Sequence, residues 1–469
     1  MIATLGPATD APEVMAVLVA AGLDVARINF AHGTPEENRR RIDALHQAAR
    51  NAGRTVAVLA DLPGPKIRAV LAKPLELAAG QEVTLATTRT GAADIQVTEP
   101  EPIRLVRPGQ RLLLDDGRLQ LKALRLNRRR LVARVEIGGT LLPKKGINLP
   151  ETPLAIPAIT DRDHEALAVA AAAGVDWLAL SFVREPGAVG ELRGAAHKVG
   201  LDVPLLAKVE LAEAVARARE IIEAFDGVLM DRGDLGVQIP LENVPHQQKQ
   251  LIALARAAGK PVITATDMLD SMRTSPRPTR AEVSDVANAI YDGTDALMLS
   301  GETAVGRYPV EALACMDRIA RATEGHLADD GLWDVFVPCA QIKDRMTHLT
   351  CALAREVGAD VILTPTHTGN TPRLVSRHRP RAAIVAPTPK ENVVRRLALV
   401  WGVLSAPLAP PLHPGEDWLE AAVRAAFAHQ VLRPGDLAVV LAGHLVEGGK
   451  WAPTLRVVRI NAEGRSCAP

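Results

Sequence analysis

VPLLAKVELAEA, residues 203–214, contains a short apolar strand, a polar turn and the alanine-containing start of a helix. Lys208 and Glu210 stand where the strand should end, and one residue lies between them. On a strand both side chains therefore point to the same face, where they must be desolvated together or meet a ligand. Two explanations are open at this point: an internal ion pair, which stabilises a fold little, or part of a binding site.

The same strand–turn–helix unit recurs from residue 2 onward, and this alternation predicts a parallel sheet. Eight candidate strands indicate that the sheet closes into a (β/α)8 TIM barrel. In chain order the strands are IATLG, DVARINF, VAVLADL, DWLALSFV, PLLAKVE, DGVLMDRG, PVITATDML and DALMLSGET.

Two further segments differ from the barrel. Residues 70–152 alternate apolar and polar side chains at period two, which predicts a small antiparallel β domain inserted in a barrel loop. Residues 326–341 lack a clear period, and the alternation then resumes in DVILTPTHTG, AAIVAPT and LAVVLAG. We therefore predict an α/β protein with a barrel over 1–69 and 153–328, the insertion over 70–152, and a C-terminal open α/β domain over 340–469.

Composition narrows the class of protein. The 469 residues, 48% of them hydrophobic, suffice for two or three globular domains. A formal net charge of +1 gives no global attraction to nucleic acid or to an anionic membrane. Cysteines without metal-ligand spacing indicate thiols in a reducing compartment, and with no signal peptide or membrane span in the sequence we expect a cytoplasmic protein. The cysteines are Cys315, Cys339, Cys351 and Cys467.

The predicted strand ends are rich in charged and polar residues. Active sites of such barrels are assembled from the C-terminal ends of several strands. So many converging groups exceed what turns require, and they favour the binding-site explanation of Lys208 and Glu210. The groups are Arg27, Asn29, Asp61, Arg68, Ser181, Arg184, Lys208, Glu210, Arg232, Asp234, Thr266, Ser300 and Glu302.

Glu210 and Asp234 are candidate ligands for Mg²⁺, because this hard cation prefers one or two carboxylates and keeps its other positions for water and substrate oxygens. The cationic side chains around them exceed what a metal site needs, and such a surplus is typical of phosphoryl transfer. Gly233 lies where backbone N–H groups can turn toward a ligand, although turns also need glycine for other reasons.

At this point the motifs resemble those of the pyruvate kinase family. The matching stretches run through all three predicted domains in the family's order. They are IATLGPAT, ARINFAHG, DLPGPKIR, KKGINLP, AKVE, FDGVLMDRGDLGVQIP, KPVITATDMLDSM, PRPTRAEVSDVANAIYDGTDALMLSGETAVGRYP and TGNTPRLVSRHRP. The resemblance implies that the insertion is a small, mobile β-barrel lid, that the C-terminal domain is regulatory, and that the chain forms a homotetramer.

The resemblance also implies a reaction and its cofactors. Phosphoenolpyruvate and ADP would give pyruvate and ATP, with Mg²⁺ as the cofactor and Mn²⁺ as a possible substitute. Glu210 and Asp234 match the metal ligands, and Lys208 matches the lysine that neutralises the transferring phosphoryl group and the enolate. Arg27 matches an arginine that holds phosphate, and Gly233 with Asp234 matches the segment that receives the substrate carboxylate.

Further positions match by the same resemblance. Thr266 matches a threonine near the carbon that is protonated, where it would position a proton relay. The residues that match the nucleotide site are Arg27, Asn29, His32, Arg68 and a lid lysine, either Lys145 or Lys144.

The chain departs from the family's pattern at the monovalent-ion site, which matches Asn29, Asp61, Leu62 and residue 66. A serine and a glutamate of the K⁺-dependent pattern are replaced by Ala31 and Lys66. Lys66, which we expect beside Asp61, can substitute a fixed ammonium group for a diffusible cation. We therefore expect K⁺ not to be required. Other departures, none of which removes a catalytic group, are Asp231 for alanine, Gln238 for glutamate and Val305 for lysine.

The segment TPTHTGNTPR, residues 364–373, places hydroxyl groups and a glycine between a strand and a helix. Such a segment is typical of an oxyanion cradle, and it matches the family's effector-phosphate loop; a plain turn with an N-cap is the alternative. The candidate effector residues are Thr366, Thr368, Gly369, Asn370 and Thr371. A phosphorylated metabolite would be the effector, and its identity stays open.

Two other functions remain as alternatives. Magnesium-dependent lyases and aldolases that act on pyruvate enolates also place a glutamate and an aspartate in a β/α barrel. A non-catalytic paralogue that senses phosphorylated metabolites would not need Lys208, Glu210, Asp234 and Thr266 all present, as they are here.

Overall fold

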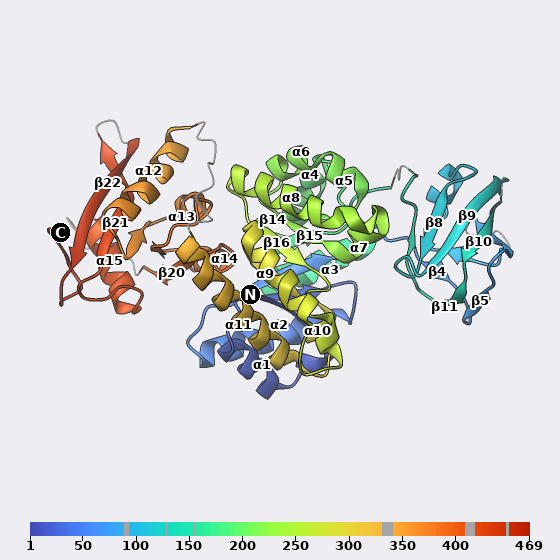
Figure 1. The fold of residues 1–469 in the computed structure, drawn as a ribbon, viewed down its shortest axis with the longest axis horizontal. Helices are drawn as coiled ribbons and strands as arrows, with labels where there is room; N and C mark the ends of the chain where they lie inside the picture. The colour runs from blue at the N-terminus through green and yellow to red at the C-terminus, as the bar shows by residue number, and fades with distance from the viewer. Residues whose placement is uncertain (89–92, 128, 153–155, 331–340, 409–417, 447–449) are drawn as a thin grey trace.

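The computed structural model describes residues 1–88, 93–127, 129–152, 156–330, 341–408, 418–446 and 450–469 (Figure 1). A central barrel has the insertion on one side and the C-terminal segment on the opposite side. Most of the segment 326–341, including Cys339, lies outside the described residues. Within the described ranges, no helix is long and apolar enough to cross a membrane.

Eight parallel strands form the closed barrel that the sequence predicts, so all eight candidate strands are confirmed. The barrel closes because β1 (Ile2–Leu5) pairs with both β2 (Val25–Asn29) and β17 (Ala296–Leu299). The other strands are β3 (Ala57–Leu62), β13 (Trp177–Leu180), β14 (Leu205–Val209), β15 (Gly227–Asp231) and β16 (Val262–Ala265).

Helices cover the outside of the barrel (Figure 1). Three of the longer ones begin at threonine N-caps, Thr34, Thr160 and Thr279, each of which forms a capping box with the residue three positions later. The helices are α1 (Pro12–Ala20), α2 (Pro35–Asn51), α3 (Asp161–Ala173), α4 (Ala188–Lys198), α5 (Ala212–Ala216), α6 (Ala218–Ala224), α7 (Arg232–Gln238), α8 (Val244–Ala258), α9 (Arg280–Asp292), α10 (Gly301–Ala304) and α11 (Pro309–Asp330).

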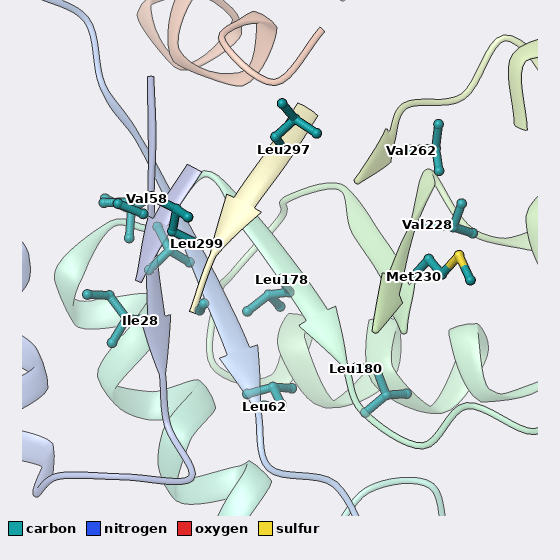
Figure 2. Packing of buried hydrophobic residues seen from close by; sticks show 14 of the residues in the cluster. Ile28, Val58, Leu62, Leu178, Leu180, Val228, Met230, Val262, Leu297 and Leu299 are labelled. Atoms are coloured by element: carbon teal, nitrogen blue, oxygen red, sulfur yellow. The ribbon is translucent and has the colours of Figure 1, made fainter. Parts of the chain in front are cut away.

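Alternation along the strands separates an outer layer of side chains from an inner one. The outer layer packs against the helices and includes Val58 and Leu178, which Figure 2 shows with other members of this cluster. The inner layer contains residues of opposite parity, such as Leu59, Leu206 and Leu229. Because successive side chains of a strand point to opposite faces, the polar residues that follow the inner layer point into the barrel at its carboxyl end.

The C-terminal segment closes the other end of the barrel. Leu399, which is 1% exposed, belongs to the same buried cluster as the inner barrel residues. Trp177 Nε1 donates a hydrogen bond to the carbonyl oxygen of Arg396 at 3.2 Å, and Arg395 Nε donates to Asp176 Oδ1 at 2.8 Å. The barrel interior is therefore apolar and packed at this end, with its polar contacts made at the junction with the C-terminal segment.

The insertion has its own apolar core and its own strands. Its main sheet is antiparallel, in the order β12-β8-β9-β10-β6, and two separate two-stranded sheets pair β11 with β5 and β4 with β7. Among the described residues the insertion is thus the separate antiparallel β domain that we predicted, built from one five-stranded sheet and two short strand pairs. The strands are β4 (Ala69–Val70), β5 (Leu75–Leu77), β6 (Glu82–Ala86), β7 (Gln96–Val97), β8 (Arg111–Leu114), β9 (Leu119–Leu126), β10 (Arg130–Ile137), β11 (Gly139–Leu141) and β12 (Ile147–Asn148).

The C-terminal segment forms the open α/β sheet that we expected, in the order β20-β19-β18-β21-β22-β23. The sequence indicated three of its strands, β18 (Val361–Leu363), β19 (Ala383–Thr388) and β21 (Leu437–Val446). The strand–helix alternation did not indicate the other three strands, β20 (Val403–Pro407), β22 (Lys450–Ile460) and β23 (Ser466–Cys467). The strands β22 and β23 run antiparallel to their neighbours. The helices are α12 (Ile342–Glu356), α13 (Asn370–Ser376), α14 (Glu391–Leu397) and α15 (Trp418–Ala428).

Candidate active site

A cavity of about 1490 Å³ opens at the carboxyl end of the barrel strands, between the barrel and the insertion. The insertion contributes Arg111, Leu113 and Asp116 to its wall. Most of the site residues predicted for the barrel therefore face one space. Those that line it are Arg27, Asn29, His32, Lys66, Arg68, Lys208, Glu210, Gly233, Asp234 and Thr266.

Lys208 occupies the centre of this site and is 5% exposed. Its Nζ lies 2.7 Å from Glu210 Oε1, 3.3 Å from Asp61 Oδ2 and 3.5 Å from Asp231 Oδ2. It also donates a hydrogen bond to Ser181 Oγ at 3.0 Å. Burial alone would lower the pKa of Lys208, but the three carboxylates raise this pKa above its ordinary value, so the ammonium group stays charged.

Glu210 is fully buried at the end of β14, on the same face as Lys208, as the one-residue spacing predicted. Its Oε2 accepts a hydrogen bond from the backbone N–H of Phe182 at 2.7 Å. Its Oε1 lies close to Lys208 Nζ but has no hydrogen-bond partner among the described residues. Burial raises the pKa of Glu210 to about 8, against the opposing effect of Lys208. A further cation near Oε1 would therefore stabilise this carboxylate.

Asp231 is a site residue that the sequence reasoning treated only as a departure from a pattern. It is 8% exposed, lines the cavity and accepts a hydrogen bond from Thr266 Oγ1 at 2.6 Å. Burial would raise the pKa of Asp231, but Lys208 and the Thr266 hydroxyl lower it to about 2. Strand parity could have found it, because Leu229 of the same strand belongs to the inner layer.

Glu210, Asp231 and Asp234 form a cluster whose candidate ligand atoms all lie within 4.8 Å of one another. Carboxylate oxygens at this spacing, those of Glu210 and Asp231 on buried side chains and that of Asp234 on a half-buried one, suit a hard divalent cation such as Mg²⁺ or Mn²⁺. The buried Oε1 of Glu210, which lacks a hydrogen-bond partner, fits the same interpretation. The chemistry of these residues therefore fits the metal that the sequence predicts.

Lys66 faces a different carboxylate from the one we expected. Its Nζ lies 2.9 Å from Asp234 Oδ1 and 4.0 Å from Asp116 Oδ1, so its partner in the site is Asp234 and not Asp61. The ammonium group also lies 5.5 Å from the centre of the Phe182 ring. Burial would lower the pKa of Lys66, but Asp234 raises it above the ordinary value.

Asp61 is 1% exposed and pairs with Arg27, whose Nη2 lies 2.6 Å from Asp61 Oδ2. Arg27 Nη1 also donates to Thr4 Oγ1 at 2.9 Å. The carbonyl oxygen of Leu62 accepts a hydrogen bond from Ser181 Oγ at 2.7 Å. Oxygens predicted for a monovalent ion are thus in contact with donors of the chain itself.

The residues predicted for the nucleotide are divided between the cavity and the insertion. Burial, with the charge of Arg68 next in effect, lowers the pKa of His32. Arg68 Nη1 donates a hydrogen bond to the carbonyl oxygen of Lys144 at 3.0 Å, which links the barrel to the insertion. Lys145 instead pairs with Asp115 at 2.6 Å and does not line the cavity in this conformation.

Thr266 stands on a turn with unusual backbone angles, since its φ is 72° and that of Asp267 is 56°. Arg232 holds this turn, because its Nη2 donates to the carbonyl oxygen of Thr266 at 2.7 Å while the same guanidinium pairs with Asp285. A Cβ atom at Gly233 would lie 2.6 Å from Thr266 Cγ2. The glycine therefore allows α7 to begin directly beside Thr266.

The loop predicted for an effector lies in the C-terminal segment, away from this cavity. Thr366 Oγ1 accepts hydrogen bonds from the N–H groups of Gly369 at 2.9 Å and Thr368 at 3.3 Å. Asn370 Oδ1 accepts one from Arg373 Nη2 at 3.0 Å, and Thr371 follows it in α13. These bonds are those of a turn before a helix, so the cradle remains a prediction.

The comparisons with known proteins agree throughout the chain. Residues 1–313 match the family model described as pyruvate kinase, barrel domain, and residues 344–458 match pyruvate kinase, alpha/beta domain. The chain is 43% identical over 458 residues to a pyruvate kinase of Geobacillus stearothermophilus, and the aligned region covers 94% of this chain and 77% of that protein. It is 39% identical over 452 residues to a pyruvate kinase of Methylorubrum extorquens, and the aligned region covers 94% of this chain and 93% of that protein.

The carboxylate cluster yields a prediction about metal affinity. Glu210→Gln keeps the side-chain volume but removes a ligand charge, so the dissociation constant of Mn²⁺ from the substrate-free protein should rise by about tenfold or more. The electron paramagnetic resonance signal of free Mn²⁺ measures this constant. Asp270→Asn, which changes a carboxylate of the same cavity outside the cluster, is the control and should leave Mn²⁺ binding nearly unchanged. An unaltered titration curve for Glu210→Gln would place the cation elsewhere.

Proposed function

This chain belongs to the pyruvate kinase family and catalyses phosphoryl transfer from phosphoenolpyruvate to ADP, giving pyruvate and ATP, and we propose that the transfer takes place in the cavity around Lys208. The observation that carries the proposal is the position of this ammonium group, buried among three carboxylates at the carboxyl end of the barrel. Membership of the family argues against both the lyase and the non-catalytic alternatives.

The residues of the cavity have distinct roles in this proposal. Glu210 and Asp234 hold a divalent cation, which when bound supplies positive charge to oxygens of the substrate. Arg27 and Lys208 place fixed positive charge beside the transferring phosphoryl group, where charge develops in the transition state. Thr266 lies next to Asp231, to which its hydroxyl donates a hydrogen bond, and positions the proton that reaches the enolate.

The nucleotide binds, in this proposal, beside Asn29, His32 and Arg68, which line the same cavity. The insertion acts as a lid, since it forms one wall of the cavity and is linked to the barrel through Arg68. Lys145 joins the nucleotide site only when the lid moves. Closure would exclude water, which otherwise competes with ADP for the phosphoryl group.

Potassium independence is a second part of the proposal. Asn29 Oδ1 accepts the N–H of Ala31 at 3.0 Å, and Asp61 and the Leu62 carbonyl accept from side chains of the barrel. Lys66 supplies a fixed positive charge at Asp234. These contacts support a site whose charge is supplied by the chain and not by a monovalent ion.

We also propose allosteric regulation through the loop that contains Thr366, Thr368, Gly369, Asn370 and Thr371. The backbone N–H groups and hydroxyls at the start of α13, together with exposed Thr368, support a phosphate ligand here. The family further leads us to propose a cytoplasmic homotetramer, which light scattering would test.

Lys208→Met tests the catalytic proposal. Turnover should fall by about a hundredfold or more, because a charge aimed at the transition state is lost. A coupled assay for pyruvate measures the rate, and circular dichroism checks the fold, since methionine leaves three carboxylates without their shared cation. Lys198→Met, on the exposed surface of α4, is the matched control. If Lys208→Met kept more than about a tenth of the wild-type turnover, the assigned role would be wrong.

The potassium proposal predicts that turnover in buffer with Mg²⁺ and tetramethylammonium stays within about a factor of two of that in KCl, whereas loss of a needed transition-state charge costs about a hundredfold. Lys66→Glu combined with Ala31→Ser should move the enzyme toward dependence on K⁺. Lys73→Glu, which reverses an exposed charge in the insertion, should not. A wild-type enzyme that is inactive without K⁺ would give Lys66 some other role.

The regulatory proposal predicts that a phosphorylated sugar or a nucleoside monophosphate changes the apparent affinity for phosphoenolpyruvate, with a coupling of about 1–3 kcal/mol. The unphosphorylated sugar or nucleoside is the control. Thr368→Glu should mimic or block the response, because it places a negative charge in the loop. A screen in which no phosphorylated metabolite changes the substrate affinity would leave the loop with a structural role only.

A further inference from the structure

Asp231 ends β15 inside the barrel, and its two carboxylate oxygens have different surroundings. Oδ1 accepts the hydrogen bond from Thr266 Oγ1 at 2.6 Å. Oδ2 lies 3.5 Å from Lys208 Nζ, and this contact is an ion pair without hydrogen-bond geometry. Since Asp231 also lines the cavity, Oδ2 is available to a ligand there.

The charges around Asp231 indicate what kind of ligand this is. Arg27 pairs with Asp61, Lys66 pairs with Asp234, and Lys208 is shared among Asp61, Glu210 and Asp231. These three cations face four carboxylates of the barrel, and Lys66 also contacts Asp116 of the insertion at 4.0 Å, so with every group ionised the cluster carries an excess of negative charge. The carboxylate of Asp231 adds to the net charge that attracts a cation into the cavity.

An independent observation at Glu210 points to the same ligand. The Oε1 atom of this fully buried side chain has Lys208 Nζ at 2.7 Å and no contact of hydrogen-bond geometry among the described residues, so it keeps lone pairs for a further cation. Candidate ligand atoms of Glu210, Asp231 and Asp234 all lie within 4.8 Å of one another. Oxygens that share one octahedral cation at about 2.1 Å are separated by at most about twice that distance. The three carboxylates can thus approach a single ion with small side-chain adjustments.

We propose that Asp231 is a third carboxylate ligand of the divalent cation, with Oδ2 facing the ion while Oδ1 remains hydrogen-bonded to Thr266. The inference rests on the proposed cation site of Glu210 and Asp234 and adds a residue to it. Asp231 then joins two parts of the active site, because one carboxylate both faces the cation and orients the Thr266 hydroxyl. With its proton directed to Asp231, that hydroxyl presents lone pairs to the substrate side of the cavity.

Two variants separate a ligand from a hydrogen-bond partner. Asp231→Asn keeps the volume and an oxygen that can accept from Thr266, but it removes the charge. Thr266→Val keeps the Asp231 carboxylate and removes the hydrogen bond. Titration of each substrate-free protein with Mn²⁺, read from the paramagnetic signal of the free ion, compares the two directly.

We expect the dissociation constant of Mn²⁺ to rise by about tenfold or more for Asp231→Asn. Mutation of residues that only support a metal ligand already lowers metal affinity by about tenfold to a hundredfold. Thr266→Val should change it by no more than about twofold, because no ligand charge is lost. Equal weakening in both variants would mean that Asp231 acts through its hydrogen bond, and unchanged Mn²⁺ binding in Asp231→Asn would also refute the ligand role.

The Glu210→Gln titration keeps this inference separate from the proposed function. If Glu210→Gln binds Mn²⁺ as the wild type does, the cation site itself is wrong. If it binds weakly while Asp231→Asn binds normally, only the role of Asp231 is wrong. Should Asp231→Asn fail to fold by circular dichroism, Mn²⁺ located by anomalous scattering in wild-type crystals decides. A distance from Mn²⁺ to Asp231 Oδ2 near 2.1 Å supports the inference, and one beyond about 3 Å overturns it.

Discussion

A buried positive charge needs negative charge close to it. The carboxylates that neutralise Lys208 organise the site at the carboxyl end of the barrel. Its ammonium group is 5% exposed and contacts three carboxylates. Each of these carboxylates fixes something else: Asp61 holds Arg27, Glu210 holds the backbone of Phe182, and Asp231 holds Thr266. The proposed catalytic groups are therefore positioned through one shared cation. Removing that cation would leave the buried carboxylates of Glu210 and Asp231 without their ion pair, which costs far more than the pairs contribute when intact.

The barrel makes this arrangement possible because strand parity assigns side chains to one of two layers. Inner residues such as Leu59, Leu206 and Leu229 fill the interior, and two residues later the same faces carry Asp61, Lys208 and Asp231. At the other end of the barrel, Leu399 from the C-terminal segment packs into the inner cluster. The interior is therefore apolar below the charged layer. A low local dielectric strengthens every charge contact in that layer and also makes any unpaired group expensive.

The fold and the central pair could be predicted from the sequence because both depend on local periodicity. Strand–helix alternation predicted all eight barrel strands, and one-residue spacing predicted that Lys208 and Glu210 share a face. The partner of Lys66 could not be predicted, because it depends on a turn in which Gly64 has a φ of 62° and its N–H donates to Asp163 Oδ1. That turn directs Lys66 to Asp234. Period-two patterns likewise predicted strands in the insertion but not their pairing, because alternation specifies a face and not a neighbour.

Lys66 and Asp231 are best understood together, although they lie far apart in the sequence. Lys66 neutralises Asp234, a carboxylate that the proposed cation site needs, through a contact of 2.9 Å. Taken alone, this contact would weaken the attraction of the cluster for a divalent ion. Asp231 adds a carboxylate to the same cluster, within 4.8 Å of Glu210 and Asp234, and so restores the charge that Lys66 offsets. The proposed replacement of a diffusible ion by a fixed ammonium group is therefore compatible with a divalent cation in this site, because a second fixed charge, of opposite sign, accompanies it.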